Sequence, residues 1–219
     1  MKWKHLETSM PLKKKWIIIG DSITDAGRTD GILPWGKGYV NLFFRWLQAR
    51  FPDNDFSCFN QGICGNTIRG LNHRWERDVL SYKPDYLIVY IGVNDAHYAL
   101  EELNSLDQNL DRFRDIYLSL LQKTQADSAL ESILITPFYC HNDQSLPIYQ
   151  TVASFAEAVR TLAAESNSRL LDLHQIFTEI AQTESNFRKW SADSVHPTDL
   201  GHRLICDKLQ TIVYTFLAQ

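Results

Sequence analysis

Runs of apolar residues recur along the chain at intervals that suit buried strands. The clearest run, Tyr86 to Ile91, is continuous, as in strands that are covered on both faces. Another begins at Trp16 and stops at Gly20. Shorter runs predict the remaining strands of a five-stranded sheet at residues 56–59, 132–135 and 169–173.

Between these runs, apolar residues follow helical spacing. Tyr39, Phe43 and Leu47 share one face of such a segment, which ends before a turn at Pro52 to Asp55. The other predicted helices cover about 67–81, 106–123, 148–165 and 201–217. Strands that alternate with helices predict a parallel sheet with helices on both faces. We therefore expect an α/β fold, a three-layer α/β/α sandwich with a flavodoxin-like five-stranded parallel sheet.

Composition agrees with a soluble globular protein. The chain has 219 residues, of which 44% are hydrophobic and 22% are charged, so we expect one domain over residues 1–219 with residues 1–14 as a lead-in. A chain of this length can bury a core without disulfides or metal. The net charge is −4 and no basic block follows Lys13 to Lys15, which argues against a nucleic-acid partner.

Cysteine and histidine spacing predicts neither a disulfide framework nor a metal site. The four cysteines, Cys58, Cys64, Cys140 and Cys206, form no Cys-x-x-Cys pair. No histidine belongs to a recognisable zinc motif, so we predict no cofactor. The N-terminus lacks an apolar stretch long enough for a signal peptide or a membrane span. We expect a cytoplasmic protein with no membrane partner.

Ligands of open parallel sheets bind beyond the carboxyl ends of the strands, and candidate catalytic groups lie on those loops. Ser22 follows the first strand in Gly20-Asp21-Ser22 and could be a nucleophile or a helix N-cap. Asp193 and His196 are spaced so that the carboxylate can hold Nδ1 and leave Nε2 for a serine, although a surface aspartate and a capping histidine would look the same.

Two further residues could stabilise an oxyanion. Asn94 follows the strand at 86–91 directly, and Gly62 could offer a backbone N–H with no side chain in the way. Gly62 alone could instead be a turn residue, and Asp95 could cap the next segment.

The combination is more specific than any single motif. The chain carries Gly20-Asp21-Ser22, Asn60-x-Gly62, Gly92-x-Asn94-Asp95 and Asp193-x-x-His196 in that order, and it is identified as a member of the SGNH, or GDSL, hydrolase superfamily. The resemblance implies a Ser22-His196-Asp193 triad and an oxyanion hole formed by the N–H groups of Ser22 and Gly62 and the side-chain amide of Asn94. The Gly-x-Ser-x-Gly elbow of α/β-hydrolases is absent.

A closer resemblance, to bacterial SGNH acetylesterases of the acetylxylan-esterase kind, runs over most of the chain. It is carried by residues 20–28, 62–69, 74–76, 136–139 and 196–197. It implies a serine-type carboxylic-ester hydrolase that removes acetyl groups from a small carbohydrate ester, without metal, through an acyl-enzyme. The alternatives are a lysophospholipase or thioesterase, and a non-catalytic module that binds a small ligand.

Several residues near these loops are candidates for substrate contact. Asp21 stands beside the proposed nucleophile, Tyr139 and His141 follow the fourth strand, and Trp190 could wall an acyl pocket or pack beneath its loop. Arg69 and Arg74 are expected to be surface or salt-bridged arginines. The loop around Trp35 could fold over the site or contact a second subunit, so a homo-oligomer stays open.

Overall fold

The computed structural model describes residues 14–31, 34–101, 105–125 and 130–218. All but the last residue of the predicted lead-in lies outside these ranges. The strands are β1 (Lys14–Gly20), β2 (Phe56–Gly62), β3 (Tyr86–Tyr90), β4 (Glu131–Ile135) and β5 (Arg169–Leu171). Their order is β2-β1-β3-β4-β5 and every pairing is parallel, which confirms the flavodoxin-like sheet.

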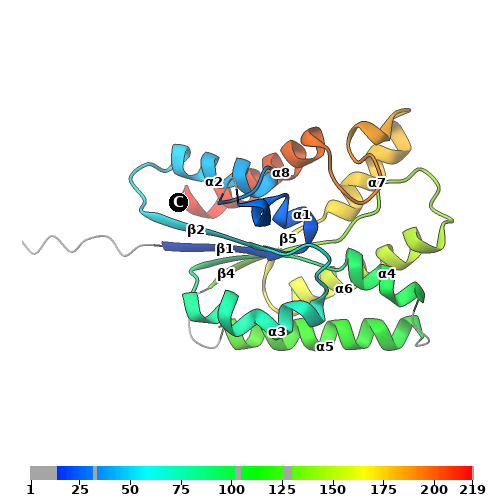
Figure 1. The fold of residues 1–219 in the computed structure, drawn as a ribbon, viewed down its shortest axis with the longest axis horizontal. Coiled ribbons are helices and arrows are strands. Elements are labelled where there is room, and N and C mark those ends of the chain that lie inside the picture. The colour runs from blue at the N-terminus through cyan, green and yellow to red at the C-terminus, as the bar shows by residue number, and fades with distance from the viewer. Residues whose placement is uncertain (1–13, 32–33, 102–104, 126–129, 219) are drawn as a thin grey trace, which may run out of the picture.

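Helices cover both faces of the sheet (Figure 1). The upper layer in that view contains α1 (Ser22–Asp25), α2 (Tyr39–Arg50), α7 (Leu173–Thr183) and α8 (Asp199–Leu217). The lower layer contains α3 (Ile68–Asp78), α4 (Val93–Glu101), α5 (Leu106–Gln125) and α6 (Pro147–Glu165). Short 3-10 turns cover Arg28–Asp30, Leu80–Tyr82 and Phe187–Lys189.

Alternate residues of each central strand enter opposite cores. Trp16, Ile18 and Ile88 belong to the cluster under the upper helices, whereas Ile17 and Val89 belong to the cluster above the lower helices. All five side chains are fully buried. This explains why these strands are apolar throughout instead of alternating with polar residues.

Three helices were not predicted, of which α1 is a single turn. The segment of α4 is short and mixes polar with apolar residues, and α7 begins where the fifth strand was expected to continue. At Asp172 the side chain accepts a hydrogen bond from the N–H of Gln175, which starts α7 and ends β5 at Leu171. The remaining predicted strands and helices are confirmed, with boundaries that differ by a few residues.

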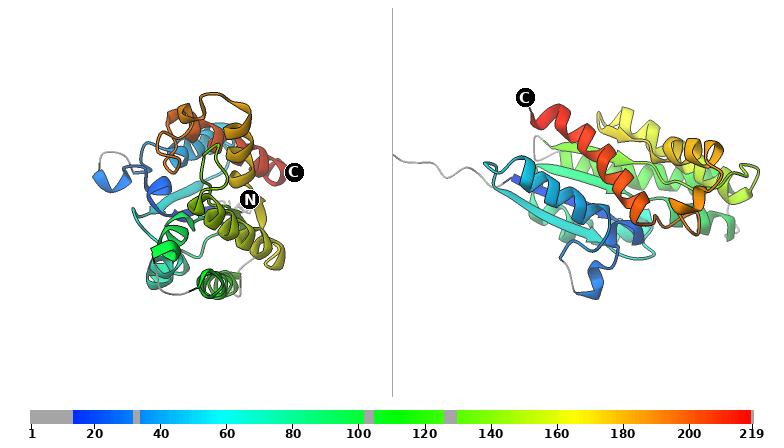
Figure 2. Two further views of the ribbon diagram at one scale, coloured as in Figure 1. Left: turned by 90° about the vertical axis from the view of Figure 1, so that its right-hand side faces the viewer. Right: turned by 90° about the horizontal axis from the view of Figure 1, so that it is seen from above.

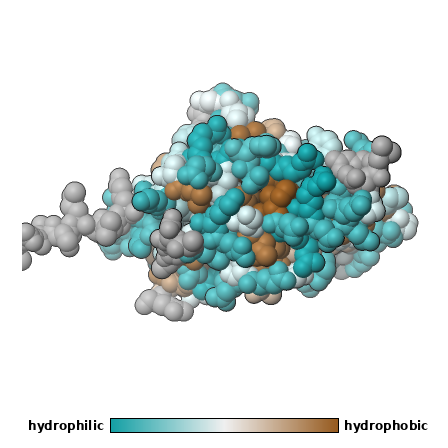
Figure 3. Space-filling model, turned by 90° about the horizontal axis from the view of Figure 1, so that it is seen from below, coloured by the Kyte–Doolittle hydropathy of each residue, from teal (hydrophilic) through white to brown (hydrophobic). Residues whose placement is uncertain are grey.

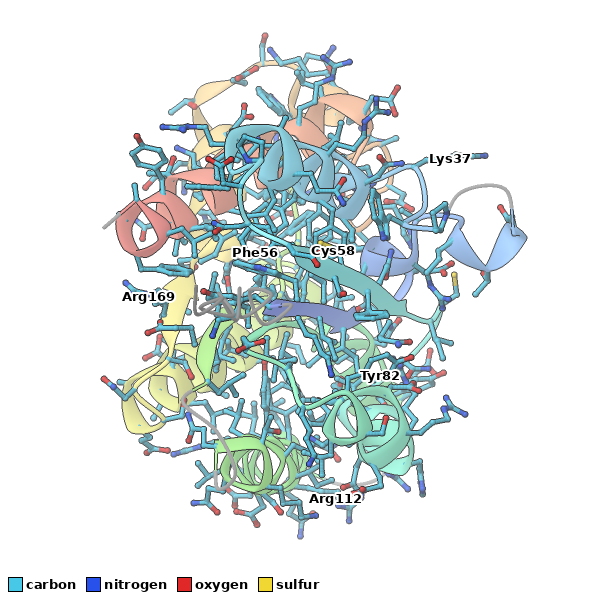
Figure 4. All side chains as sticks on the ribbon, turned by 90° about the vertical axis from the view of Figure 1, so that its left-hand side faces the viewer. Lys37, Phe56, Cys58, Tyr82, Arg112 and Arg169 are labelled. Carbon is cyan, nitrogen blue, oxygen red and sulfur yellow. The ribbon has the colours of Figure 1, made fainter. Side chains whose placement is uncertain are left out.

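The carboxyl ends of the strands face right in Figure 1 and toward the viewer in the left panel of Figure 2. Figure 4 shows the opposite end, where Phe56 begins β2. Strand order reverses direction between β1 and β3, so the loops after these two strands diverge to opposite layers. A crevice between such loops is where ligands of this fold bind.

Candidate active site

Ser22 is placed by a sharp turn from β1 into α1. The Asp21 carboxylate accepts a hydrogen bond from the N–H of Ile23 at 3.0 Å and caps this single helical turn. Gly20 is required just before it, because an added Cβ would lie 2.3 Å from the carbonyl oxygen of Tyr90. Ser22 is therefore the first residue of α1, directly after the N-cap residue Asp21. The sequence also allowed Ser22 itself to be the N-cap, but its hydroxyl is not used for capping.

The hydroxyl of Ser22 instead contacts a histidine from the other end of the chain. Its Oγ lies 3.0 Å from Nε2 of His196, and Nδ1 of the same ring lies 2.7 Å from Oδ2 of Asp193. The structure thus brings together all three residues predicted for the triad. Serine, imidazole and carboxylate in this order form a proton relay that can activate the hydroxyl as a nucleophile.

Asp193 is fixed by its own loop. Its Oδ1 accepts hydrogen bonds from the backbone N–H groups of Val195 at 3.0 Å and His196 at 2.7 Å. Burial alone would raise the pKa of the Asp193 carboxyl, but the hydrogen bonds from the His196 ring and from these two N–H groups outweigh it and lower that pKa. The carboxylate therefore stays charged and holds the imidazole in one orientation.

Ser194 ties the triad loop to the loop after β4. Its backbone has φ 74, the left-handed region that a serine seldom adopts. Its carbonyl oxygen accepts a hydrogen bond from the N–H of Cys140 at 2.8 Å. Tyr139 and His141 flank Cys140, so the structure places both predicted contact residues on a loop that adjoins the triad.

The other two residues predicted to contact substrate, Asp21 and Trp190, are less accessible to a ligand. Asp21 is fully buried, so a direct contact with substrate is not supported, and its role in the structure is to cap α1. Burial raises the pKa of Asp21 to about 7, against the opposing effects of the Ile23 N–H and of His196. Trp190 is half-buried and packs against the upper core, which favours the packing alternative.

The N–H of Gly62 is occupied, which corrects its predicted role as an oxyanion donor. It donates to Oδ1 of Asn60 at 2.8 Å. A Cβ at Gly62 would lie 2.2 Å from the backbone nitrogen of Asp25, so the glycine is needed for close packing of β2 against α1. The sequence motif indicates that position 62 requires a glycine, but it does not show that the close contact with Asp25 is the reason.

Asn94 lies at the start of α4, at the same end of the sheet as Ser22. One hydrogen of its Nδ2 group is donated to the carbonyl oxygen of Asn66 at 2.9 Å, which orients the amide and leaves the other hydrogen for a ligand. Asp95 lies in the first turn of α4 and does not cap the segment that follows it; its carboxylate instead accepts from the N–H of Ile68 at the start of α3, an earlier helix.

Arg74 supports the loop after β2 from below, as a residue that sequence reasoning set aside. Its buried guanidinium donates to the carbonyl oxygens of Gln61 at 2.8 Å and Gly20 at 3.1 Å. It also pairs with Asp78 at 2.8 Å. The expectation of a salt-bridged arginine is confirmed, and the hydrogen bonds from its guanidinium hold the two strand ends that carry the site.

The loop around Trp35 lies along β2. Trp35 Nε1 donates to the carbonyl oxygen of Cys58 at 3.0 Å, and its ring packs edge-on against Phe44. The adjoining turn at residues 28–30 projects from the body of the molecule (Figure 2).

This arrangement defines a class: a hydrolase with a Ser-His-Asp triad at the carboxyl end of a flavodoxin-like sheet. Comparison with known proteins gives the family. Residues 18–204 match the model of the GDSL-like Lipase/Acylhydrolase family, and the chain belongs to this family. The protein is a carboxylic-ester hydrolase, in agreement with the prediction.

Similarity to individual proteins extends over most of the chain. An acetylxylan esterase from Geobacillus stearothermophilus is 35% identical over 202 residues, which are 88% of this chain and 90% of that protein. A crystal structure of an acetylxylan esterase from this organism gives a TM-score of 0.80 at 32% identity, covering 92% of this chain and 95% of that one. Catalytic mutants of that enzyme replace a serine, an aspartate or a histidine with alanine.

A second solved structure is similar over nearly as much of the chain. The crystal structure of an alpha/beta hydrolase enzyme from the metagenome of Lake Arreo, Spain, gives a TM-score of 0.75 at 31% identity and covers 90% of this chain and 94% of that one.

Proposed function

We propose that the protein removes acetyl groups from hydroxyls of carbohydrates, with Ser22 as the nucleophile. The observation that carries the proposal is the contact of Ser22 Oγ with His196 Nε2 at 3.0 Å, backed by Asp193. The similarity to an acetylxylan esterase over most of both chains supports the acetyl group and the sugar.

The chemistry proceeds in two halves. His196 Nε2 takes the Ser22 proton as Oγ attacks the ester carbonyl carbon, and the same proton then passes to the departing sugar oxygen, which leaves acetyl on Ser22. Water attacks this acyl-enzyme after giving a proton to His196, and acetate is released as Ser22 regains its proton. Asp193 keeps the ring in the tautomer that exposes Nε2.

We infer that Gly65, not Gly62, supplies the second backbone donor to the oxyanion. Gly65 lies between two anchored neighbours: the Cys64 thiol contacts Asp25 of α1 at 3.2 Å, and the carbonyl oxygen of Asn66 binds Asn94. Gly65 is exposed, has φ 72, and has open space where a Cβ would be. Its peptide therefore lies between the Ser22 helix and the Asn94 amide, where the Ser22 N–H would be the third donor.

Comparison of ester chain lengths tests the acetyl group. We expect a higher kcat/KM on p-nitrophenyl acetate than on the octanoate, and release of acetate from acetylated xylo-oligosaccharides by purified protein. A preference for octanoate would replace the proposal with the lysophospholipase or thioesterase alternative. Hydrolysis of p-nitrophenyl acetate without activity on any acetylated sugar would keep the esterase and remove the carbohydrate.

The described residues contain no helix that is both long and apolar enough to cross a membrane. All four cysteines are free. Free cysteines are typical of a reducing compartment, and we propose the cytoplasm as the location.

A further inference from the structure

A cavity of about 240 Å³ opens between the helices of the lower layer. Its lining comes from the start of α3, from α4, from α5 and from Phe155 of α6. The volume is below the range of about 300–1,000 Å³ that holds drug-sized ligands, so the cavity suits a single ring. None of Ser22, Asp193 and His196 lines it.

The cavity nevertheless adjoins the catalytic site. Asp95, in its wall, directly follows Asn94, and Ile68, beside it, donates its N–H to both carboxylate oxygens of Asp95 at 3.0 and 3.2 Å. The start of α4 is thus a shared wall, with the oxyanion amide on one side and the cavity on the other.

Three polar groups of the cavity have unused hydrogen-bonding capacity. The Nδ2 group of Asn109 is buried and has no hydrogen-bond partner among the described residues, which is costly for an amide. The carboxyl group of Asp95 accepts the N–H of Ile68 and has lone pairs to spare. Arg112 is exposed at the cavity and forms no ion pair within the described part of the chain.

Apolar surface accompanies these groups. Phe113 and Phe155 are almost fully buried and pack edge-on with ring centroids 5.0 Å apart. Tyr98 is 50% exposed, although large aromatic residues usually bury most of their area. Figure 3 shows this lower face, where hydrophobic residues surface between hydrophilic ones, and Figure 4 shows Arg112 in the lower layer.

We propose that this cavity is a second binding site for one neutral pyranose ring. A sugar has hydroxyls that both donate and accept, which suits a set containing a carboxylate, an amide N–H and a guanidinium. Its C–H face can lie against Tyr98 and the phenylalanines. The charged groups of the lining have both signs, with the carboxyl group of Asp95 beside the guanidinium groups of Arg69 and Arg112, so a neutral ring meets no net repulsion. The site goes beyond the proposed hydrolysis and does not depend on it.

Binding of sugars without acetyl groups tests the site apart from catalysis. In the Ser22→Ala variant, saturation-transfer NMR and calorimetry with D-xylose and xylobiose are expected to show binding in the millimolar range. Ala99→Phe, which fills the cavity without removing a polar group, should abolish the binding of D-xylose. Asn109→Ala should weaken it by about tenfold, the effect of one lost hydrogen bond.

The matched pair is Arg112→Ala and Arg114→Ala, both on α5. Arg114 is two residues further along the helix, pairs with Glu165 and does not line the cavity, so only Arg112→Ala should weaken binding, again by about tenfold. Thermal unfolding of each variant separates a folding defect from a binding defect. Absence of sugar binding, or binding that Ala99→Phe and Arg112→Ala leave unchanged, would overturn the proposal. Binding of benzoate in preference to D-xylose would also overturn it.

Discussion

Ser22 and His196 are 174 residues apart in the chain, and their side chains meet at 3.0 Å. The contact joins the turn after β1 to the loop before α8, so it forms only when both have docked on the carboxyl end of the sheet. His196 is half-exposed, its side chain being 55% accessible. Its ring is therefore held by Asp193 and Ser22 and remains open to substrate and water.

Loss of His196 should abolish activation of Ser22. His196→Ala is expected to prevent labelling of Ser22 by a fluorophosphonate, because no base then takes the serine proton. His202→Ala is the control: His202 is partly buried, accepts a hydrogen bond from the N–H of Tyr39 and touches no triad atom among the described contacts. Its variant should label normally. Equal labelling of both variants would remove His196 from the mechanism.

Ser22→Ala should lower kcat by about 10⁶, as the loss of a triad nucleophile can. The hydroxyl makes no capping bond, so the melting temperature should change little. Steady-state kinetics on p-nitrophenyl acetate measures the effect, and near-normal activity would contradict the assignment.

Asn94→Ala should lower kcat by about 10²–10³ with a smaller change in KM, because the amide acts on the charge that develops at the carbonyl oxygen. The same variant loses the hydrogen bond to Asn66, which orients the loop that carries Gly65. A change confined to KM would indicate a contact with the ground-state substrate instead.

The two glycines of the loop after β2 should respond differently to alanine. Gly62→Ala places a Cβ 2.2 Å from the backbone of Asp25 and should mainly lower the melting temperature. Gly65→Ala meets no atom but forces alanine into a left-handed conformation, which costs about 1–2 kcal/mol. If Gly65 supplies the oxyanion donor, this variant should lose kcat in excess of its loss of stability. A reversed pattern would return the role to Gly62.

Arg74 and Arg77 offer a matched test of buried against exposed ion pairs. Both contact Asp78, but Arg74 is buried whereas the Arg77 side chain is 74% exposed. Arg74→Ala should reduce the free energy of unfolding by about 3–5 kcal/mol, since it also leaves two strand-end carbonyls without their donor. Arg77→Ala should have little effect. Urea unfolding measures both, and equal losses would show that the strand-end contacts contribute nothing.

Stability should fall as the pH rises toward neutrality because of Asp21. Its pKa is raised from 3.8 to about 7 by burial, so the folded state holds this proton more tightly than the unfolded state. The resulting contribution is complete below the unfolded value and is lost as the pH rises to about 7. Asp21→Asn keeps the oxygen that caps α1 and removes the titration.

The variant should therefore gain stability relative to the natural protein between about pH 5 and about pH 8. Asp95, whose pKa burial also raises to about 7, preserves part of the decline in both proteins. Thermal unfolding at the two pH values gives the comparison. If Asp21→Asn were less stable than the natural protein at the higher pH, a charged Asp21 would support the fold.

Local pattern was enough to predict the fold because the central strands are apolar on both faces. Ile17, Ile19 and Val89 are fully buried. Their segments show no helical or alternating pattern, so they predict only buried strands. The helix α4 was not predicted because its nine residues are too few to show a long apolar stripe. Its position is set by packing against α5 and α6, which the local sequence does not reveal. That the whole of residues 1–219 forms one domain, and whether it forms a homo-oligomer, stay predictions.

The sequence by itself determined which residues could do the chemistry: a serine and an asparagine at predicted strand ends, and an Asp-x-x-His pair on the loop before the last helix. Only the tertiary structure decided their partners. It brought Ser22 to His196, gave the Gly62 N–H to Asn60, buried Asp21 and turned Trp190 toward the core. The physical reason is that strand runs and motif spacing are set by neighbouring residues, whereas hydrogen-bond partners and burial depend on which distant segments the folded sheet brings together.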